Sequence, residues 1–486
     1  VKRRFSQYDN VYISKDTPLV IGDASKYIKD VKNGKVNFYH QIEYALDLKN
    51  CDIRMTFLPN IYVINFFSLN SVKEFVQKCP KFIDRRNISH VGFGKLFPKA
   101  VMHSYSNQEW KKRHENMLKE TGINFISKHI PSMINAVGSR IKTWGNGKKS
   151  GDLLAEMADV TFVIMTNILF GKDISSEVED MEYINPTTNE VSNLNFDQAY
   201  TKISKDVMSN RLNIKSLLLP FLGRHNISAP YNVNYKNIRN LWKVLSGYLD
   251  THTDQDSVYN RLVKNTITAK EDIFQDLMGF LFAGHETSSH SIGSALFLLY
   301  KNQNTKEKLE KELAEFKGKN HEELLMMITK EKIDELEYLH MVVKETLRFD
   351  PPASDALPYE VVENTEICGV PIQKGEIINV NFLSRHYDPE QWHDPLKFIP
   401  ERFDPESKYF TAPSTGKVRD PMSWIPFSTH IRSCPGQTLA MLEIKVILVY
   451  LLSRVDFEFA EHLMESDFAY FGIISQLTLD FEAELK

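Results

Sequence analysis

A cysteine placed just before a helix is the residue best suited to chemistry in this chain of 486 residues. Cys434 stands in the run FSTHIRSCPG, residues 427–436, and a helical pattern begins at Gln437. Free backbone N–H groups and the helix dipole at such a position favour the thiolate, and Arg432 adds positive charge nearby. Cys434 could therefore be a nucleophile or a metal ligand, and a buried structural cysteine is the alternative.

A second polar group interrupts a long apolar helical pattern. The run AGHETS, residues 283–288, brings a glycine, a carboxylate and hydroxyls into mid-helix, where Gly costs about 1 kcal/mol relative to Ala. Conflicts of this kind often mark function. Gly284 allows close approach to the backbone, and the Thr287 hydroxyl can bond the preceding turn or a ligand. A packing glycine beside a solvent-facing Glu286 is the alternative.

A third candidate is the pair Glu345 and Arg348, which share a helix face because they are three residues apart. A surface ion pair contributes only about 0 to 1 kcal/mol. Taken alone, this spacing therefore indicates a solvated pair rather than a functional one.

The elements that position these residues are mainly helical. Thr268 and Glu271 form a capping-box signature that predicts a long, largely buried helix up to about Tyr300. Further predicted helices begin near Asp334 and at Gln437. Short strands are expected at 53–57, 61–67, 360–362 and 377–380. The fold class is therefore mainly α with a minor β region, in one domain over 1–486 with a β-rich part at about 1–70, a helical core at about 109–350 and the Cys loop at 427–436.

Composition narrows the function further. A net charge of -4 gives no general attraction for nucleic acid. The longest strictly apolar runs are far shorter than the roughly 20 residues of a membrane span. No CxxC pair occurs among the four cysteines, so neither a zinc ribbon nor a disulfide scaffold is expected. We therefore expect the protein in a reducing compartment. The start, residues 1–4, lacks a Met and an apolar core, as in a chain whose leader or anchor was removed.

Together these residues resemble the haem-thiolate monooxygenases of the cytochrome P-450 family. The Cys loop matches the family pattern FxxGxRxCxG at every fixed position except His430, which replaces the first Gly. The runs AGHETS, KETLR followed by Pro-Pro, and PERF at 400–403 occur in the family's order. Trp110, with His114 four residues later, is similar to the family's WxxxR/H helix. The resemblance extends from about residue 50 to the end.

The resemblance implies a cytochrome P-450 fold with one haem b, whose iron is ligated by the Cys434 thiolate. Such a ligand pushes electron density onto the iron and favours O–O cleavage. Ala283, Gly284 and Thr287 would line the oxygen side, where Glu286 and Thr287 would deliver protons. The expected product is a hydroxylated or epoxidised lipophilic molecule.

The resemblance assigns further roles. Haem contacts are implied for Phe427, Gly436, Arg432, Trp110 and His114. A buried group that braces the Cys loop is implied for Glu345, Arg348 and Arg402. An apolar substrate pocket is implied for Phe280, Ala356, Leu357, Ile473 and Ile474.

The expected electron source is NADPH, through NADPH-cytochrome P-450 reductase or another donor such as a ferredoxin. Lys111, Lys112 and Arg113 begin a basic patch that could dock an acidic flavoprotein, with a solvated helix face as the alternative. If an anchor was removed, the protein belongs at the cytosolic face of the endoplasmic reticulum membrane; otherwise it is cytoplasmic.

The sequence departs from the family pattern at three places, and it leaves two alternative functions. His430 must adopt a conformation that Gly reaches more readily. The usual basic residue is missing from 353–361, and so is the Pro-rich hinge near the start. The alternatives are a dioxygen-independent isomerase or dehydratase of peroxide substrates and a non-enzymatic haem gas sensor. Glu286 and Thr287 favour the monooxygenase, because neither alternative needs a proton-delivery pair.

Overall fold

The chain forms two compact units. The computed structural model describes residues 1–14, 51–58, 61–90, 92–178, 180–209, 225–227, 230–252, 256–460, 470–471, 474–475 and 479–485. The first unit comprises Val1–Asp84, Ile126–Val160 and Glu286–Lys486, and the second comprises Arg85–Phe125 and Thr161–His285. Two helices, α8 (Leu153–Phe170) and α14 (Lys270–Lys301), contribute residues to both units. The single domain over the whole chain therefore stays a prediction.

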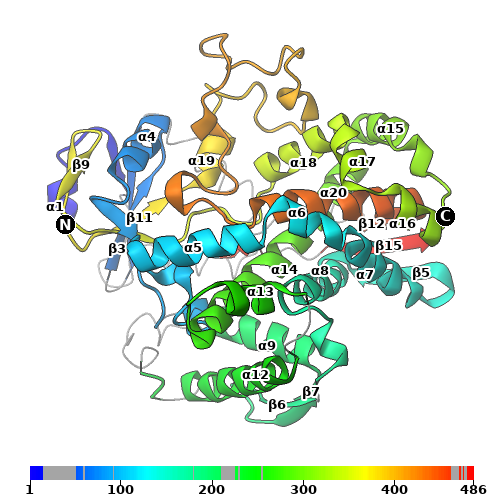
Figure 1. Cartoon of the computed structure of the whole chain (residues 1–486). Helices are drawn as coiled ribbons and strands as arrows, with labels where there is room; N and C mark the ends of the chain where they lie inside the picture. The colour runs from blue at the N-terminus through cyan, green and yellow to red at the C-terminus, as the bar shows by residue number, and fades with distance from the viewer. Residues whose placement is uncertain are drawn as a thin grey trace. The chain divides into compact units, whose positions relative to one another are not determined.

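The first unit holds a six-stranded sheet in the order β1-β2-β3-β11-β8-β4. Its strands are β1 (Val11–Ile13), β2 (Ile53–Leu58), β3 (Ile61–Phe66), β4 (Ile83–Arg85), β8 (Tyr359–Val361) and β11 (Ile377–Val380). Helix α4 (Leu69–Lys78) packs on this sheet (Figure 1), where its Val72 and Phe75 join Ile64 and Tyr359 in one apolar cluster. A smaller sheet pairs β12 (Val455–Phe459), β15 (Asp480–Leu485) and β5 (Lys148–Asp152), and β9 (Thr365–Ile367) pairs with β10 (Val370–Ile372).

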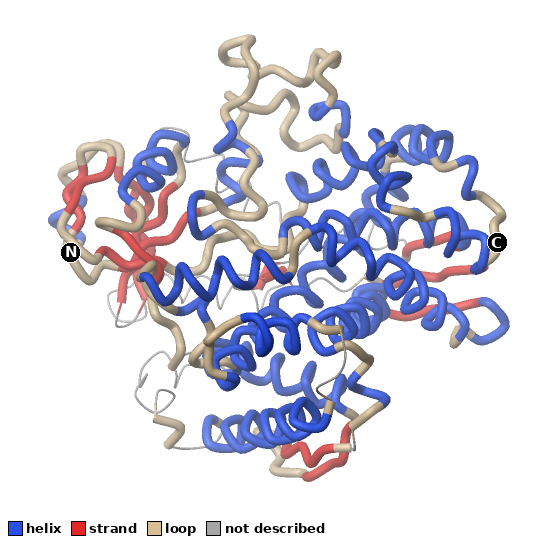
Figure 2. The backbone as a smooth tube through the Cα atoms, viewed as in Figure 1, coloured by secondary structure: helices blue, strands red, loops and turns tan. Residues whose placement is uncertain are grey.

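The helices of the first unit surround one strongly apolar helix, α20 (Gln437–Arg454). Its residues from Leu442 to Ser453 are all buried, as expected of a helix that is apolar all round. It contacts α7 (Ile130–Lys142), α17 (Lys330–Glu335) and α18 (Glu337–Phe349). The unit also contains α15 (Gln303–Glu312), α16 (His321–Met327) and α19 (Phe382–His386). Between α19 and α20 the chain is mostly loop (Figure 2).

The second unit is mainly helical. Its helices include α5 (Gln108–Glu120), α9 (Phe196–Ser209), α12 (Tyr231–Thr251), α13 (Val258–Asn265) and the first half of α14. One hairpin, β6 (Met181–Ile184) with β7 (Val191–Leu194), contacts α12. The mainly α fold class with a minor β region is confirmed.

Most predicted elements agree with the observed bounds, and two differ. The long helix begins at Lys270 rather than at the predicted capping box. The helix predicted from Asp334 is interrupted at Leu336, whose ψ of 80° ends α17 before α18 begins. Helix α8 is long and apolar enough to cross a membrane, but 67% of its residues are buried inside the protein. Core helices of globular proteins have the same composition, so α8 gives little support for a span.

Candidate active site

Cys434 lies at the end of a hydrogen-bonded loop that leads directly into α20. Its backbone N–H donates to the Phe427 carbonyl at 2.8 Å, which closes the loop. Its sulfur accepts hydrogen bonds from the backbone N–H groups of Gly436 and Gln437. Free N–H groups at the start of a helix thus point at the sulfur, as the sequence predicted.

Cys434 is exposed as a residue, while protein packs around its thiol. Cys434 is exposed, whereas Cys51 and Cys79 are buried. Burial nevertheless raises the pKa of the Cys434 thiol, and the two N–H donors only partly oppose this effect. The helix start therefore favours the thiolate, as the sequence predicted, while burial of the sulfur opposes it.

The donor set at Cys434 fits a haem iron. Within the described ranges, no group of three His, Cys, Asp or Glu side chains could hold a metal ion. A site with one sulfur donor suits a metal that brings its other ligands with it, as iron does in a porphyrin. An exposed cysteine with N–H groups directed at its sulfur has the surroundings that a thiolate ligand requires.

Two residues of the Cys loop adopt left-handed backbone conformations. Ser428 has a φ of 61° and His430 a φ of 66°. The prediction that His430 takes a conformation favoured by Gly is confirmed. A non-Gly residue held there costs of order 1 to 3 kcal/mol. Burial lowers the pKa of the His430 imidazole, and the nearby Asp84 carboxylate opposes that shift.

Three buried charged residues of the first unit, Glu345, Arg348 and Arg402, converge on one carboxylate. Arg348 donates from Nε and Nη2 to the two oxygens of Glu345, both at 2.8 Å. Arg402 donates from Nε to Glu345 Oε1 at 3.1 Å. All three side chains are 0% exposed. Two guanidinium groups thus share one carboxylate, and their remaining donors bond backbone carbonyls within 386–397.

The charged group connects to the Cys loop through two side chains. Arg348 Nη1 donates to the His386 carbonyl at 2.9 Å. Burial lowers the pKa of His386 to about 3, so its ring is neutral, and Nε2 accepts the Ile425 N–H at 3.0 Å. The Trp424 indole donates to the Lys344 carbonyl of α18 at 3.2 Å. The residues just before the loop are therefore held at fixed positions.

Oxygen-side residues predicted from the sequence form an accessible stripe on the otherwise buried helix α14. Ala283 is exposed, and Phe280, Gly284 and Thr287 are partly exposed, at the spacing of one helix face. At Gly284 a Cβ atom would lie 2.5 Å from Met165 Cε. Close packing against Met165 therefore accounts for this glycine, whichever ligand the stripe meets.

Sequence reasoning missed Glu443, a completely buried carboxyl group in α20. Ser288 donates to its Oε2 at 2.6 Å, which ties α14 to the helix that begins after Cys434. Its other oxygen has no hydrogen-bond partner among the described residues. Burial raises the pKa of Glu443 to about 8. A single carboxylate in an apolar helix was the only sequence signal.

Other predicted haem contacts lie in different parts of the chain. In the second unit, the rings of Trp110 and His114 stack with centroids 5.0 Å apart. In the first unit, Arg432 is 8% exposed and Phe427 is partly buried. A shared contact of these residues with one haem stays a prediction.

The predicted basic patch must be corrected at Arg113. This side chain is buried, and it donates from Nη2 and Nε to the two oxygens of Asp276 at 2.7 and 3.0 Å. Arg113 is three residues after the buried Trp110 and so shares its helix face. Only Lys111 and Lys112 of the predicted patch are exposed.

The predicted pocket residues are only partly supported. Ala356 is 4% exposed and belongs to the apolar cluster of the six-stranded sheet, as a packing residue does. Leu357 is partly exposed. Ile473 lies outside the described residues, and Ile474 lies in β14 (Ile474–Ser475) with a side chain that is also outside them. Their role as a substrate pocket stays a prediction.

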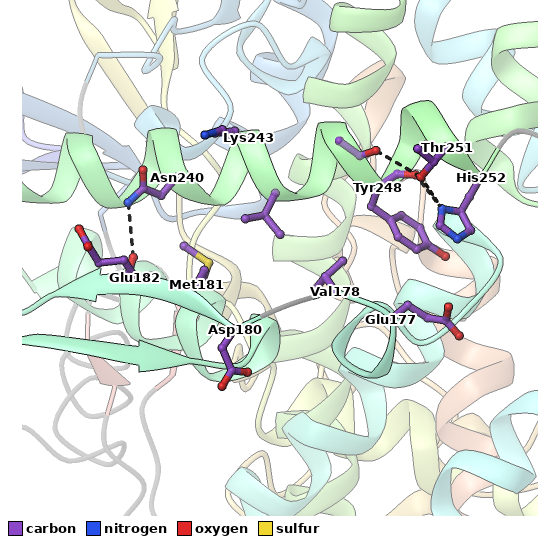
Figure 3. Close-up of a pocket in the computed structure, with 12 residues that line it drawn as sticks. Glu177, Val178, Asp180, Met181, Glu182, Asn240, Lys243, Tyr248, Thr251 and His252 are labelled. Atoms are coloured by element: carbon purple, nitrogen blue, oxygen red, sulfur yellow. Dashed lines mark hydrogen bonds between the residues drawn. The ribbon is translucent and has the colours of Figure 1, made fainter.

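A separate hollow of about 820 Å³ lies in the second unit between β6 and α12 (Figure 3). At one end of it, Thr251 and His252 are hydrogen-bonded at 2.9 Å, and the His252 ring stacks on Tyr248. None of the predicted haem-site residues lines this hollow.

Comparison with known proteins identifies relatives of this chain. The family model described as Cytochrome P-450 matches residues 39–475. The chain is 36% identical over 182 residues to cytochrome P-450 4V2 of Rattus norvegicus, 37% of this chain and 32% of that protein. It is 30% identical over 247 residues to berbamunine synthase of Berberis stolonifera, with 49% and 47% covered.

A third relative is thromboxane-A synthase of Sus scrofa. The chain is 32% identical to it over 198 residues, with 41% of this chain and 34% of that protein covered. The chain thus spans about a third to a half of the length of these curated relatives.

Replacing Arg348 by Ala should release the Cys loop. It would leave the buried Glu345 carboxylate with Arg402 and the Ile399 N–H as partners of one oxygen and without its ion pair to Arg348, which costs about 3 to 5 kcal/mol. We expect a lower free energy of unfolding in urea and loss of haem from the purified protein. Arg239→Ala, an exposed change in α12, is the matched control. Full haem content in Arg348→Ala would contradict the bracing role.

Replacing Glu443 by Gln should change how stability depends on pH. Because the folded pKa is about 8 and the ordinary value 4.5, the folded protein holds one extra proton between these pH values. Stability is therefore lost as pH rises through this window, by about 1.4 kcal/mol per pH unit. The free energy of unfolding of the parent, relative to Glu443→Gln, should fall by this slope between pH 5 and 7. Parallel pH profiles would show that Glu443 ionises normally.

Proposed function

Because this chain belongs to the cytochrome P-450 family, we propose that it is a haem-thiolate monooxygenase that hydroxylates or epoxidises a lipophilic small molecule. The observation that carries the proposal is Cys434, an exposed residue just before α20 whose sulfur has backbone N–H donors directed at it. The accessible stripe on α14 supplies the second requirement, a helix face open to small molecules.

When bound, a haem b with a thiolate ligand supplies the electron density that favours O–O cleavage. Cys434 provides the sulfur, and Gly436 and Gln437 stabilise its negative charge through their N–H groups. Phe427 shapes the loop, and Arg432, Trp110 and His114 are the proposed partners of the propionates.

The residues of α14 would handle the protons. Glu286 and Thr287 are both partly exposed in an otherwise buried stretch, so solvent protons can reach them. The Thr287 hydroxyl both accepts and donates, which a relay requires. Ala283 and Phe280 offer apolar surface on the same face, and this favours a lipophilic substrate.

The electron donor is proposed to be an NADPH-dependent flavoprotein reductase at the cytosolic face of the endoplasmic reticulum, with a ferredoxin as the alternative. The exposed Lys111 and Lys112 of α5 offer positive charge to an acidic partner.

The ligand assignment is tested by reducing the purified protein under carbon monoxide. We expect the strongly red-shifted Soret band of a thiolate-ligated haem. Cys434→Ala should lack this band, whereas Cys79→Ala, a change at a buried cysteine, should keep it. A red-shifted band in Cys434→Ala, or none in the parent, would refute the assignment.

Replacing Thr287 by Ala should separate electron transfer from product formation. Haem binding and substrate affinity should be nearly unchanged, because the hydroxyl is needed only for protons. General acid catalysis contributes about 100-fold or more, so product formed per NADPH should fall several-fold as peroxide forms instead. An unaltered ratio would show that protons do not pass through Thr287, and would favour the dioxygen-independent alternative.

Reversing the charge of Lys111 and Lys112 to Glu should slow reduction by the flavoprotein at low ionic strength. The difference from the parent should shrink above about 0.1 M salt, where the Debye length falls below about 10 Å. The control is the same charge change at Lys236 and Lys243, which are exposed on α12. Equal rates in both double variants would exclude steering by α5.

A further inference from the structure

A buried polar cluster joins α14 to the end of α18 within the first unit. His290 Nε2 lies 3.0 Å from Asp350 Oδ2, and Ser294 donates to the same oxygen at 2.5 Å. His290 is 3% exposed, and Ser294 and Asp350 are both 0% exposed. Neither the sequence motifs nor the proposed haem site accounts for this cluster.

The cluster continues the helix face that carries Thr287. His290 and Ser294 follow Thr287 by three and seven residues, and residues at this spacing lie one above the other on a helix. Helical side chains slope back toward the N-terminus, over the preceding turn. The His290 ring therefore leans toward the turn that contains Thr287 and away from the end of α14.

The two ring nitrogens of His290 have different surroundings. Nε2 lies 3.0 Å from Asp350 Oδ2, at an angle that does not make a hydrogen bond, and the nearby carboxylate favours the tautomer with its proton there. Nδ1 is buried and has no hydrogen-bond partner among the residues that the structure describes. Buried polar atoms of this kind need an explanation, and a bound water is a common one.

An acid that orients an imidazole, whose second nitrogen is left open, is an arrangement suited to passing protons. Asp350 also precedes Pro351 and Pro352, which limit its backbone freedom, and its own N–H donates to the Thr346 carbonyl at 2.7 Å. The carboxylate is thus held by backbone and side chain together, and it can hold the ring in one orientation.

We propose that His290 is a positioning residue for proton delivery: its Nδ1 binds the water through which the Thr287 hydroxyl is supplied, and Asp350 and Ser294 hold the ring for this task. This inference rests on the proposed monooxygenase function. In each passage, Nδ1 takes a proton from one side of the water chain and returns one to it, so the ring is unchanged after turnover.

The test compares His290→Gln and Asp350→Asn with Ser453→Ala, which removes a buried hydroxyl of α20 that donates to the Val449 carbonyl and lies outside the cluster. We expect unchanged haem content, carbon monoxide band and KM in all three. Product formed per NADPH should fall by about threefold or more in the first two variants. The solvent isotope effect on the rate of product formation should also change in these two variants. Ser453→Ala should stay near the parent.

A readout that does not depend on turnover comes from NMR of ring-labelled histidine. In the parent, the His290 signals should show a protonated Nε2, and Asp350→Asn should shift them. If His290→Gln proves unstable, Asp350→Asn decides the question alone.

The outcomes separate this inference from the function on which it rests. A parent without the thiolate band would overturn the proposed function and this inference with it. A parent with the band, whose Asp350→Asn variant keeps the product ratio, the isotope effect and the histidine signals, would overturn the role of His290 alone. The cluster would then only join α14 to α18.

Discussion

The first unit depends on one carboxylate, that of Glu345, which holds two guanidinium groups completely out of water. Removing such charges from solvent costs several kcal/mol per ion, and only dense hydrogen bonding offsets this cost. Arg348 and Arg402 achieve it by donating to Glu345 and to backbone carbonyls within 386–397. These hydrogen bonds fix the irregular segment within 386–397, which has few helix or strand hydrogen bonds of its own. The Cys loop that follows this segment is held in position as a result.

A second constraint comes from the buried helix α20, which starts beside the Cys434 sulfur and continues through the core. Its polar residue Glu443 contacts Ser288 of α14, next to Thr287. The helix that follows the cysteine is thus linked to the helix that carries the proposed proton donors. Because a densely packed interior moves little, a shift of one helix would be transmitted to the other.

Motifs identified the family, but they could not report contacts between residues far apart in the sequence. Spacing alone placed Glu345 and Arg348 on one face, and the resemblance added Arg402, as the structure shows. The left-handed conformation of His430 was predicted because His430 stands where the family pattern has Gly. By contrast, Glu443 and Asp350 have partners 155 and 56 residues away in sequence, and no local pattern reports such contacts. Arg113 was misplaced for the same reason, since Asp276 lies on a distant helix.

The central claim is that this scaffold presents the Cys434 sulfur to a haem iron. X-ray absorption at the iron edge of the purified haem-loaded protein tests it most directly, because the scattering distinguishes sulfur from nitrogen or oxygen. We predict one sulfur neighbour in addition to the haem nitrogens, lost in Cys434→Ser. An iron with only nitrogen and oxygen neighbours in the parent protein would contradict the account.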